Sequence, residues 1–169
     1  VEMYEATLRL IRARGMDRYE VSNYAEPGQE CRHNLAYWRA EDWLAAGPSA
    51  SGHVAGNRWK NTPRLDDYLT FDDNGLASIT DWELPDPRRA LCERIMTGLR
   101  TREGLDEKWM LAELPRIGRN TDALGRIVSE HIAKGLAERN GGSIRLTDAG
   151  MLLADGIAGA MMDAVPTST

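Results

Sequence analysis

The sequence has few of the residues that build covalent or metal frameworks, with two cysteines, three histidines and one phenylalanine among 169 residues. Cys31 and Cys92 form no C-x-x-C pair, which excludes a disulfide framework and a closed zinc site, and we expect both to be free thiols. No apolar run approaches the roughly 18 residues of a membrane span, and no signal-peptide pattern opens the chain. These absences favour a cytoplasmic protein.

The composition is that of a globular protein, with 42% hydrophobic and 28% charged residues. The net charge of −5 arises in residues 1–84, whereas residues 85–169 carry equal numbers of acidic and basic side chains. Neither half therefore predicts a polyanion binder by bulk charge. The chain begins with Val1 inside an amphipathic segment, and we expect it to be a piece of a longer protein.

The first half of the chain predicts a helix that leads into a strand. Residues 1–14 have an apolar helical face, and Gly15 follows as a C-terminal cap. Tyr19 and Val21 alternate with polar residues, which predicts a strand over residues 17–24. A helix running into a strand is typical of α/β architectures. Further on, Thr62 is expected to cap a short helix that begins at residue 63.

Residues 72–87 are rich in turn formers and acid, and we predict a domain boundary there. Beyond it the pattern predicts three helices, a hairpin around Asn140, Gly141 and Gly142, and a final helix capped by Thr147. The helices are expected at residues 88–99, 105–114 and 121–135. This order describes a small winged-helix-like domain of the α+β class, after a first part of the α/β class.

A winged helix raises the hypothesis of DNA binding through its third helix. The predicted exposed positions of that helix alternate in charge, namely Asp122, Arg126, Glu130 and Lys134. Groove binders need a basic surface, because binding depends on the release of counterions from the phosphates. We therefore expect no nucleic-acid binding, and a domain that packs on another protein segment instead.

Three separated segments resemble one known family in the same order. They are "RYEVSNYAEPGQECRHNLAYWRAEDWLAAGPSASGHV", "IMTGLRTREGL" and "IRLTDAGMLLADGI". They are similar to the radical S-adenosylmethionine enzymes related to oxygen-independent coproporphyrinogen III oxidase. The resemblance implies that residues 1–84 are the C-terminal part of a radical S-adenosylmethionine (β/α) barrel with its extension, and residues 85–169 the winged-helix-like C-terminal domain.

The segment "HNLAYW" resembles the H-N-x-x-Y-W pattern of the heme chaperone branch of this family. The resemblance implies heme contacts for His33, Asn34, Tyr37 and Trp38, with His33 as the iron ligand. A neutral imidazole is a good ligand for heme iron, and aromatic neighbours can cover a porphyrin face. Without the resemblance, a structural histidine satisfied by hydrogen bonds is the alternative. Cys31 departs from the serine more often found before this pattern.

The run "AAGPSASG" resembles the family's segment that passes near bound S-adenosylmethionine. The resemblance places Pro48, Ser49, Ala50 and Ser51 close to the nucleoside, and small residues allow backbone groups to approach a ring. Close strand packing without a ligand is the alternative. His53 is a further candidate to line the same cavity.

The family's C-x-x-x-C-x-x-C motif, whose thiolates bind a 4Fe-4S cluster, occurs nowhere in this sequence. The spacing of the two cysteines cannot replace it. The resemblance therefore assigns S-adenosylmethionine and the cluster to the full-length protein, whose N-terminal barrel region we expect to be missing here. We expect the chain alone to be inactive as an enzyme.

The resemblance implies a heme chaperone that binds heme and delivers it to heme-requiring client proteins. Its expected partners are heme, these clients and the missing N-terminal region, with membrane association only through clients. The alternative is oxygen-independent coproporphyrinogen III oxidase, which performs an oxidative decarboxylation with S-adenosylmethionine. A winged-helix nucleic-acid module is a third hypothesis, and whether the full-length protein is an enzyme stays open.

Overall fold

The computed structural model describes residues 2–70, 79–118 and 122–165. The chain divides into two compact units: the main unit, residues 1–39 with 87–169, and the inserted unit, residues 40–86. The later boundary lies close to the division expected after residue 84. Residues 1–39 nevertheless group with the C-terminal part, because backbone and ion-pair contacts tie them to it. Their assignment to a barrel stays a prediction.

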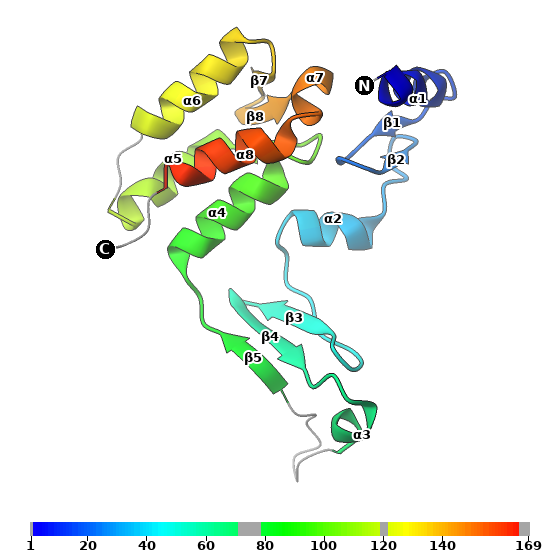
Figure 1. Ribbon diagram of the computed structural model, residues 1–169, viewed down its shortest axis with the longest axis vertical. Coiled ribbons are helices and arrows are strands. Elements are labelled where there is room, and N and C mark those ends of the chain that lie inside the picture. The colour runs from blue at the N-terminus through cyan, green and yellow to red at the C-terminus, as the bar shows by residue number, and fades with distance from the viewer. Residues whose placement is uncertain (1, 71–78, 119–121, 166–169) are drawn as a thin grey trace. The chain divides into compact units, whose positions relative to one another are not determined.

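The main unit contains most of the helices (Figure 1). In its first segment the elements are α1 (Glu2–Arg12), β1 (Asp17–Arg18), β2 (Tyr24–Ala25) and α2 (Arg32–Trp38). In its second segment they are α4 (Pro87–Gly98), β6 (Leu105–Asp106), α5 (Glu107–Arg116), α6 (Asp122–Ala133), β7 (Ala137–Asn140), β8 (Ser143–Leu146), α7 (Asp148–Met151) and α8 (Ala154–Asp163).

The inserted unit is built on a three-stranded antiparallel sheet in the order β3-β4-β5. Its elements are β3 (Ser51–Val54), β4 (Asn57–Asn61), α3 (Leu65–Tyr68) and β5 (Ile79–Glu83). Trp59 of β4 covers Gly52 of β3 so closely that a Cβ at Gly52 would lie 2.2 Å from the indole. The sheet therefore depends on a glycine at this position.

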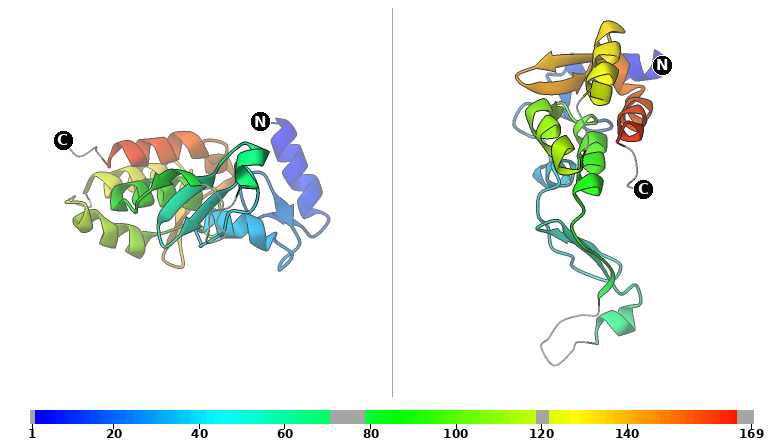
Figure 2. Two further views of the ribbon diagram at one scale, coloured as in Figure 1. Left: turned by 90° about the horizontal axis from the view of Figure 1, so that it is seen from below. Right: turned by 90° about the vertical axis from the view of Figure 1, so that its left-hand side faces the viewer.

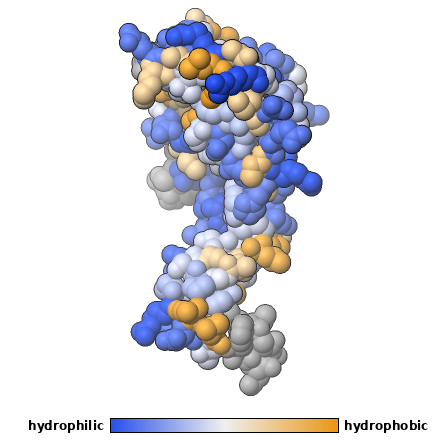
Figure 3. Space-filling model, turned by 90° about the vertical axis from the view of Figure 1, so that its right-hand side faces the viewer, coloured by the Kyte–Doolittle hydropathy of each residue, from blue (hydrophilic) through white to orange (hydrophobic). Residues whose placement is uncertain are grey.

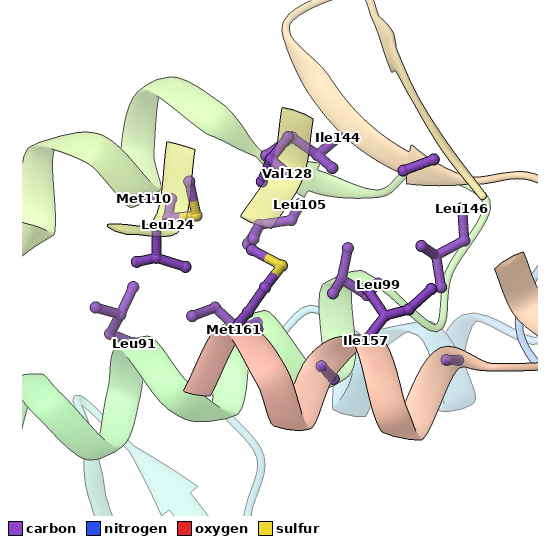
Figure 4. Close-up of a cluster of buried hydrophobic side chains, with 14 of the residues drawn as sticks. Leu91, Leu99, Leu105, Met110, Leu124, Val128, Ile144, Leu146, Ile157 and Met161 are labelled. Atoms are coloured by element: carbon purple, nitrogen blue, oxygen red, sulfur yellow. The ribbon is translucent and has the colours of Figure 1, made fainter. Parts of the chain in front are cut away.

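The hydrophobic core lies in the main unit, where α4, α5, α6 and α8 close over the β6-β8-β7 sheet (Figure 4). Leu91, Ile95 and Leu99 recur every four residues and are fully buried, which is the periodicity of a core-facing helix. Met161 of α8 and Ile144 of β8 belong to the same cluster. Figure 3 shows one face of the molecule, where scattered apolar side chains interrupt a mostly hydrophilic surface.

The hairpin predicted around Asn140 is confirmed, and it lies beside α6 (Figure 2). Gly141 and Gly142 have φ values of 59° and 86°, as a tight two-residue hairpin turn requires. The predicted cap is also confirmed, since the Thr147 hydroxyl accepts the backbone N–H of Gly150 at 3.1 Å. The last helix is divided into α7 and α8. The overall class is mixed α and β, and the winged-helix description stays a prediction.

The strand predicted over residues 17–24 is wrong, because this segment folds back as a short hairpin. β1 pairs antiparallel with β2, with Arg18 opposite Tyr24. The turn is closed by the carboxylate of Glu20, which accepts the backbone N–H of Ser22 at 3.2 Å and the side-chain amide of Asn23. Alternation alone did not indicate that this buried acid would end the strand.

Two further expectations are corrected in the inserted unit. The helix expected from residue 63 begins at Leu65, and its cap position is Arg64, which makes no side-chain capping bond. Thr62 is buried instead, and its carbonyl accepts the backbone N–H of Ser49 at 3.2 Å. Residues 79–83, expected to belong to an irregular boundary, form β5 because they pair with β4. The expected turn residues 72–78 lie outside the described residues.

An ion-pair group joins the start of the main unit to α7. Asp148 accepts hydrogen bonds from Arg12 at 2.7 and 3.1 Å and from Arg18 at 3.1 Å. Asp17 also binds Arg12, at 3.1 Å. The pKa of Asp148 is lowered, chiefly by the hydrogen bond from Arg12. Arg18 is buried, and a buried charge without a partner is strongly destabilising, so the pairing of Arg18 with Asp148 matters for the stability of the fold.

We expect Gly150→Ala to destabilise the protein by about 1–3 kcal/mol, because the new Cβ would lie 1.8 Å from the carbonyl oxygen of Leu136. Gly156→Ala is the control, since it lies within α8 with open space around it. The control should be neutral or stabilising by about 0.5–1 kcal/mol. Urea unfolding measures both, and equal stability of the two variants would contradict the packing.

We expect Asp148→Asn to lower the free energy of unfolding at pH 7 by about 1 kcal/mol, a value reduced for the exposure of this carboxylate. The lowered pKa of Asp148 means that its contribution is complete above the pKa of the unfolded chain. It is lost as the pH falls through the folded value. The difference from wild type should therefore shrink below about pH 4.

Unfolding measured from pH 2 to pH 8 tests this dependence. The matched control is Asp163→Asn, which changes an exposed acid of α8. A difference between wild type and Asp148→Asn that stays constant across this pH range would contradict the ion-pair explanation.

Candidate functional site

The predicted heme-contact residues lie on α2, a helix of seven residues. His33 and Tyr37, one turn apart, share an exposed stripe. Their ring centroids lie 4.8 Å apart with the planes at 82°, an edge-on arrangement. The spacing therefore correctly predicted that these two rings lie together.

Asn34 and Trp38 lie one turn apart on the neighbouring face of α2, and both side chains are partly buried. The side-chain amide of Asn34 donates to the hydroxyl of Tyr19 at 3.2 Å, so Asn34 links α2 to the β1–β2 segment. The indole N–H of Trp38 is buried and has no hydrogen-bond partner in the described part of the chain. A buried donor without a partner is costly, and a ligand or water acceptor there would remove that cost.

The opposite side of α2 anchors the helix to the main unit. Leu35 is buried, and the guanidinium of Arg39, just after the helix, pairs with Glu103. This hydrogen bond is the main cause that lowers the pKa of Glu103. Arg94 also donates to the carbonyl of Arg39. These contacts keep α2 in place while its His33 stripe stays accessible.

His33 differs from the other two histidines in its surroundings. Nδ1 of His131 lies 2.8 Å from the carbonyl of Ile127, and Nδ1 of His53 lies 3.1 Å from that of Glu41. His33 is exposed, and no hydrogen bond of its ring nitrogens occurs among the described residues. Both ring nitrogens of His33 are therefore available to an external ligand.

Pro48, Ser49, Ala50 and Ser51 lie together at a turn that leads into β3 in the inserted unit. Ser49 has a positive φ of 59°, and its N–H donates to the Thr62 carbonyl. The N–H of Ala50 donates to the carbonyl of Gly47 at 3.3 Å. These backbone donors are satisfied inside the inserted unit, which fits close packing without a ligand.

A pocket of about 490 Å³ opens on the β3-β4-β5 sheet, and Ser51 lies in its lining. Trp43, Trp59 and Lys60 line it as well. The ring of His53, the further candidate for this cavity, packs against Trp43 at 4.7 Å. Trp82 stacks on Trp59 at 5.9 Å.

Two features were missed from the sequence. The exposure of Trp82 was not foreseen, because no local pattern in the sequence indicates it. The ion-pair group at Asp148 was also missed, because its partners are separated by about 130 positions and no local spacing signals them.

The remaining chemistry of the described residues is limited. Both cysteines are free, as expected, and no group of three or more histidine, cysteine or acidic side chains that could hold a metal ion occurs there. These side chains are compatible with a metal bound through one histidine, as heme iron is, and His33 is such a candidate. Within those same ranges, none of the helices combines the length and apolar character that crossing a membrane requires.

Comparison with known proteins identifies the family. Residues 86–153 match the HemN C-terminal domain. The heme chaperone HemW of Bacillus subtilis is 32% identical over 162 residues, covering 95% of this chain and 42% of that protein. HemW of Mycobacterium tuberculosis strain H37Rv is 32% identical over 154 residues, covering 91% and 37%. The chain thus spans about two fifths of the length of these relatives.

A solved structure also matches, that of the radical SAM enzyme coproporphyrinogen III oxidase (HemN) from Escherichia coli. The TM-score is 0.64 at 15% sequence identity, over 93% of this chain and 39% of that one. This likeness shows a shared fold. The HemW relatives and the matched domain show that the chain belongs to the HemW-like family, with the HemN C-terminal domain in residues 86–153.

Proposed function

We propose that the chain is the heme-binding C-terminal part of a radical S-adenosylmethionine family heme chaperone, which delivers heme to client proteins in the cytoplasm. On this proposal, residues 1–84 complete the barrel and its extension, and residues 85–169 form a winged-helix-like domain. HemW relatives at 32% identity over most of the chain support the chaperone assignment.

The observation that carries the proposal is the exposed imidazole of His33, whose nitrogens form no hydrogen bond with the residues that the structure describes. A structural histidine is normally buried or held by hydrogen bonds, as His131 is. His33 instead presents its nitrogens at the surface, with Tyr37 edge-on beside it. In the proposed complex a neutral His33 ligates the heme iron through one nitrogen.

The neighbouring side chains take separate roles in this proposal. Tyr37 lies against His33 and limits the rotation of its ring, while contributing apolar surface for one porphyrin face. Trp38 offers a buried indole N–H that lacks an acceptor among the described residues. Asn34 is a positioning residue, because its bond to Tyr19 fixes the orientation of α2.

The S-adenosylmethionine contacts belong to the same proposal. Pro48, Ser49, Ala50 and Ser51 form one turn, and Ser51 borders a pocket. The backbone of this turn is already bonded within the inserted unit. The two free cysteines do not fit a 4Fe-4S cluster, so we assign its ligands to the remainder of a full-length protein.

The alternative function is oxygen-independent coproporphyrinogen III oxidase. Its support is the shared fold with HemN, at 15% identity. The two functions differ in their product, since the oxidase forms protoporphyrinogen by decarboxylation and a chaperone leaves the porphyrin unchanged. Protoporphyrinogen formation by a full-length protein containing this chain would establish the alternative.

We expect the chain to bind hemin saturably, with a Soret band typical of histidine ligation. His33→Ala should weaken hemin binding at least about ten-fold and abolish the histidine-type spectrum, because it removes the axial ligand. Absorption titration of the purified chain measures both the affinity and the spectrum.

The matched control for this titration is His131→Ala, which removes a histidine of α6 that bonds the Ile127 carbonyl. Its hemin affinity and spectrum should equal those of wild type. Circular dichroism verifies that both variants fold. Equal binding by wild type and folded His33→Ala would refute His33 as the ligand.

We expect no salt-dependent binding of duplex DNA. Asp122, Arg126 and Glu130 of α6 and Lys134 just after it are all exposed and alternate in charge, so they offer no basic surface for phosphate contacts. Fluorescence anisotropy with a labelled duplex at 50 mM salt measures this. A saturable rise in anisotropy at 50 mM salt that disappears at 200 mM salt would show that the domain binds nucleic acid.

A further inference from the structure

A pocket of about 270 Å³ lies within the main unit, away from α2. α1 and β1 contribute one side of it, through Arg12 and Arg18. The β7–β8 hairpin and α7 contribute the other side, through Arg145 and Asp148. The segments that meet here are more than 100 positions apart in the sequence.

Arg18 is the unusual residue of this pocket, because its side chain is only 7% exposed. Its Nη2 donates to Asp148 at 3.1 Å, whereas its Nη1 is buried and has no hydrogen-bond partner in the described part of the chain. The guanidinium carbon lies 5.7 Å from the ring centroid of Tyr4, whose hydroxyl is also buried and has no partner among the residues that the structure describes. Two buried donors thus lack acceptors in one region.

The charge balance of the pocket leaves an excess of cations. The described residues that line it include four arginines and three acids. Two of the acids, Asp17 and Asp148, are shared among Arg12, Arg18 and Arg102. The third acid and the fourth arginine are Glu138 and Arg145.

Arg145 has binding capacity left for a ligand. Its Nε donates to the carbonyl of Glu103 at 3.2 Å, and no bond of its terminal nitrogens occurs among the described residues. Glu138 lies opposite Arg145 in the β7–β8 register, but it is exposed and forms no ion pair within those ranges. Arg18 and Arg145 both line the pocket, so an anion there would lie beside the Arg18 guanidinium and the terminal nitrogens of Arg145.

We propose that this pocket is a binding site for a small oxyanion, a phosphate or carboxylate group, held by Arg18 and Arg145. The planar guanidinium presents paired N–H donors that match the oxygens of both groups, and burial strengthens such charge-assisted bonds. The volume of about 270 Å³ suits a small metabolite and excludes a porphyrin. The site is independent of the heme proposal, because it uses none of the α2 residues.

The test is isothermal titration calorimetry of the purified chain with inorganic phosphate and, separately, with sodium acetate, in 150 mM sodium chloride. At this ionic strength, interactions between exposed charges are largely screened beyond about 8 Å. Saturable binding of either probe supports the site. The probe that binds more tightly identifies the group, phosphate or carboxylate. Absence of saturable binding of both probes refutes the proposal.

Substitutions locate the site. Arg18→Gln and Arg145→Gln should each weaken binding of the preferred probe by about ten-fold or more. Arg145→Gln keeps the test valid if Arg18→Gln fails to fold, because the Arg145 side chain is only partly buried. Glu138→Gln should strengthen binding several-fold, because it removes a competing negative charge from an exposed position.

The matched control is Arg14→Gln, which removes one exposed positive charge from the turn after α1. It should bind the probe as wild type does. An equal loss of affinity in the control and in Arg145→Gln would mean that the effect is one of net charge, and the proposed site would be wrong.

Discussion

The position of α2 depends on a backbone connection between two segments far apart in the sequence. Glu20 forms an antiparallel bridge with Thr101, and the N–H of Arg102 donates to the carbonyl of Tyr19 at 2.9 Å. Thr101 is buried, and its hydroxyl is fixed by the carbonyl of Gly98 at 2.9 Å. The residues just after α4 therefore hold Tyr19, which in turn bonds Asn34 of α2. The orientation of His33 thus depends on contacts with the C-terminal part of the chain.

The elements that could be predicted are those with local signals. The Asn140-Gly141-Gly142 turn and the Thr147 cap specify their own geometry within a few residues, and the structure has both. The His33–Tyr37 contact follows from helical spacing in the same way. Each of these needed no knowledge of the rest of the fold.

The elements that could not be predicted depend on partners distant in sequence or on buried charge. The hairpin at residues 17–25 is closed by the buried carboxylate of Glu20, and β5 exists because it pairs with β4. The Asn34–Tyr19 bond and the pairing of Arg18 with Asp148 likewise join separate segments. Sequence patterns describe one segment at a time. They therefore identified the candidate residues but not the contacts with distant segments that hold those residues in place.

The inserted unit forms a long loop between two segments of the main unit that contact each other. The contact between Tyr19 and Arg102 closes a loop that contains all of residues 40–86. The entropy cost of closing a flexible loop grows with the logarithm of its length, by about 0.6 kcal/mol for each doubling. Lengthening or shortening this insertion therefore changes the free energy of unfolding of the main unit only slightly. Stability alone places little constraint on the length of the inserted unit.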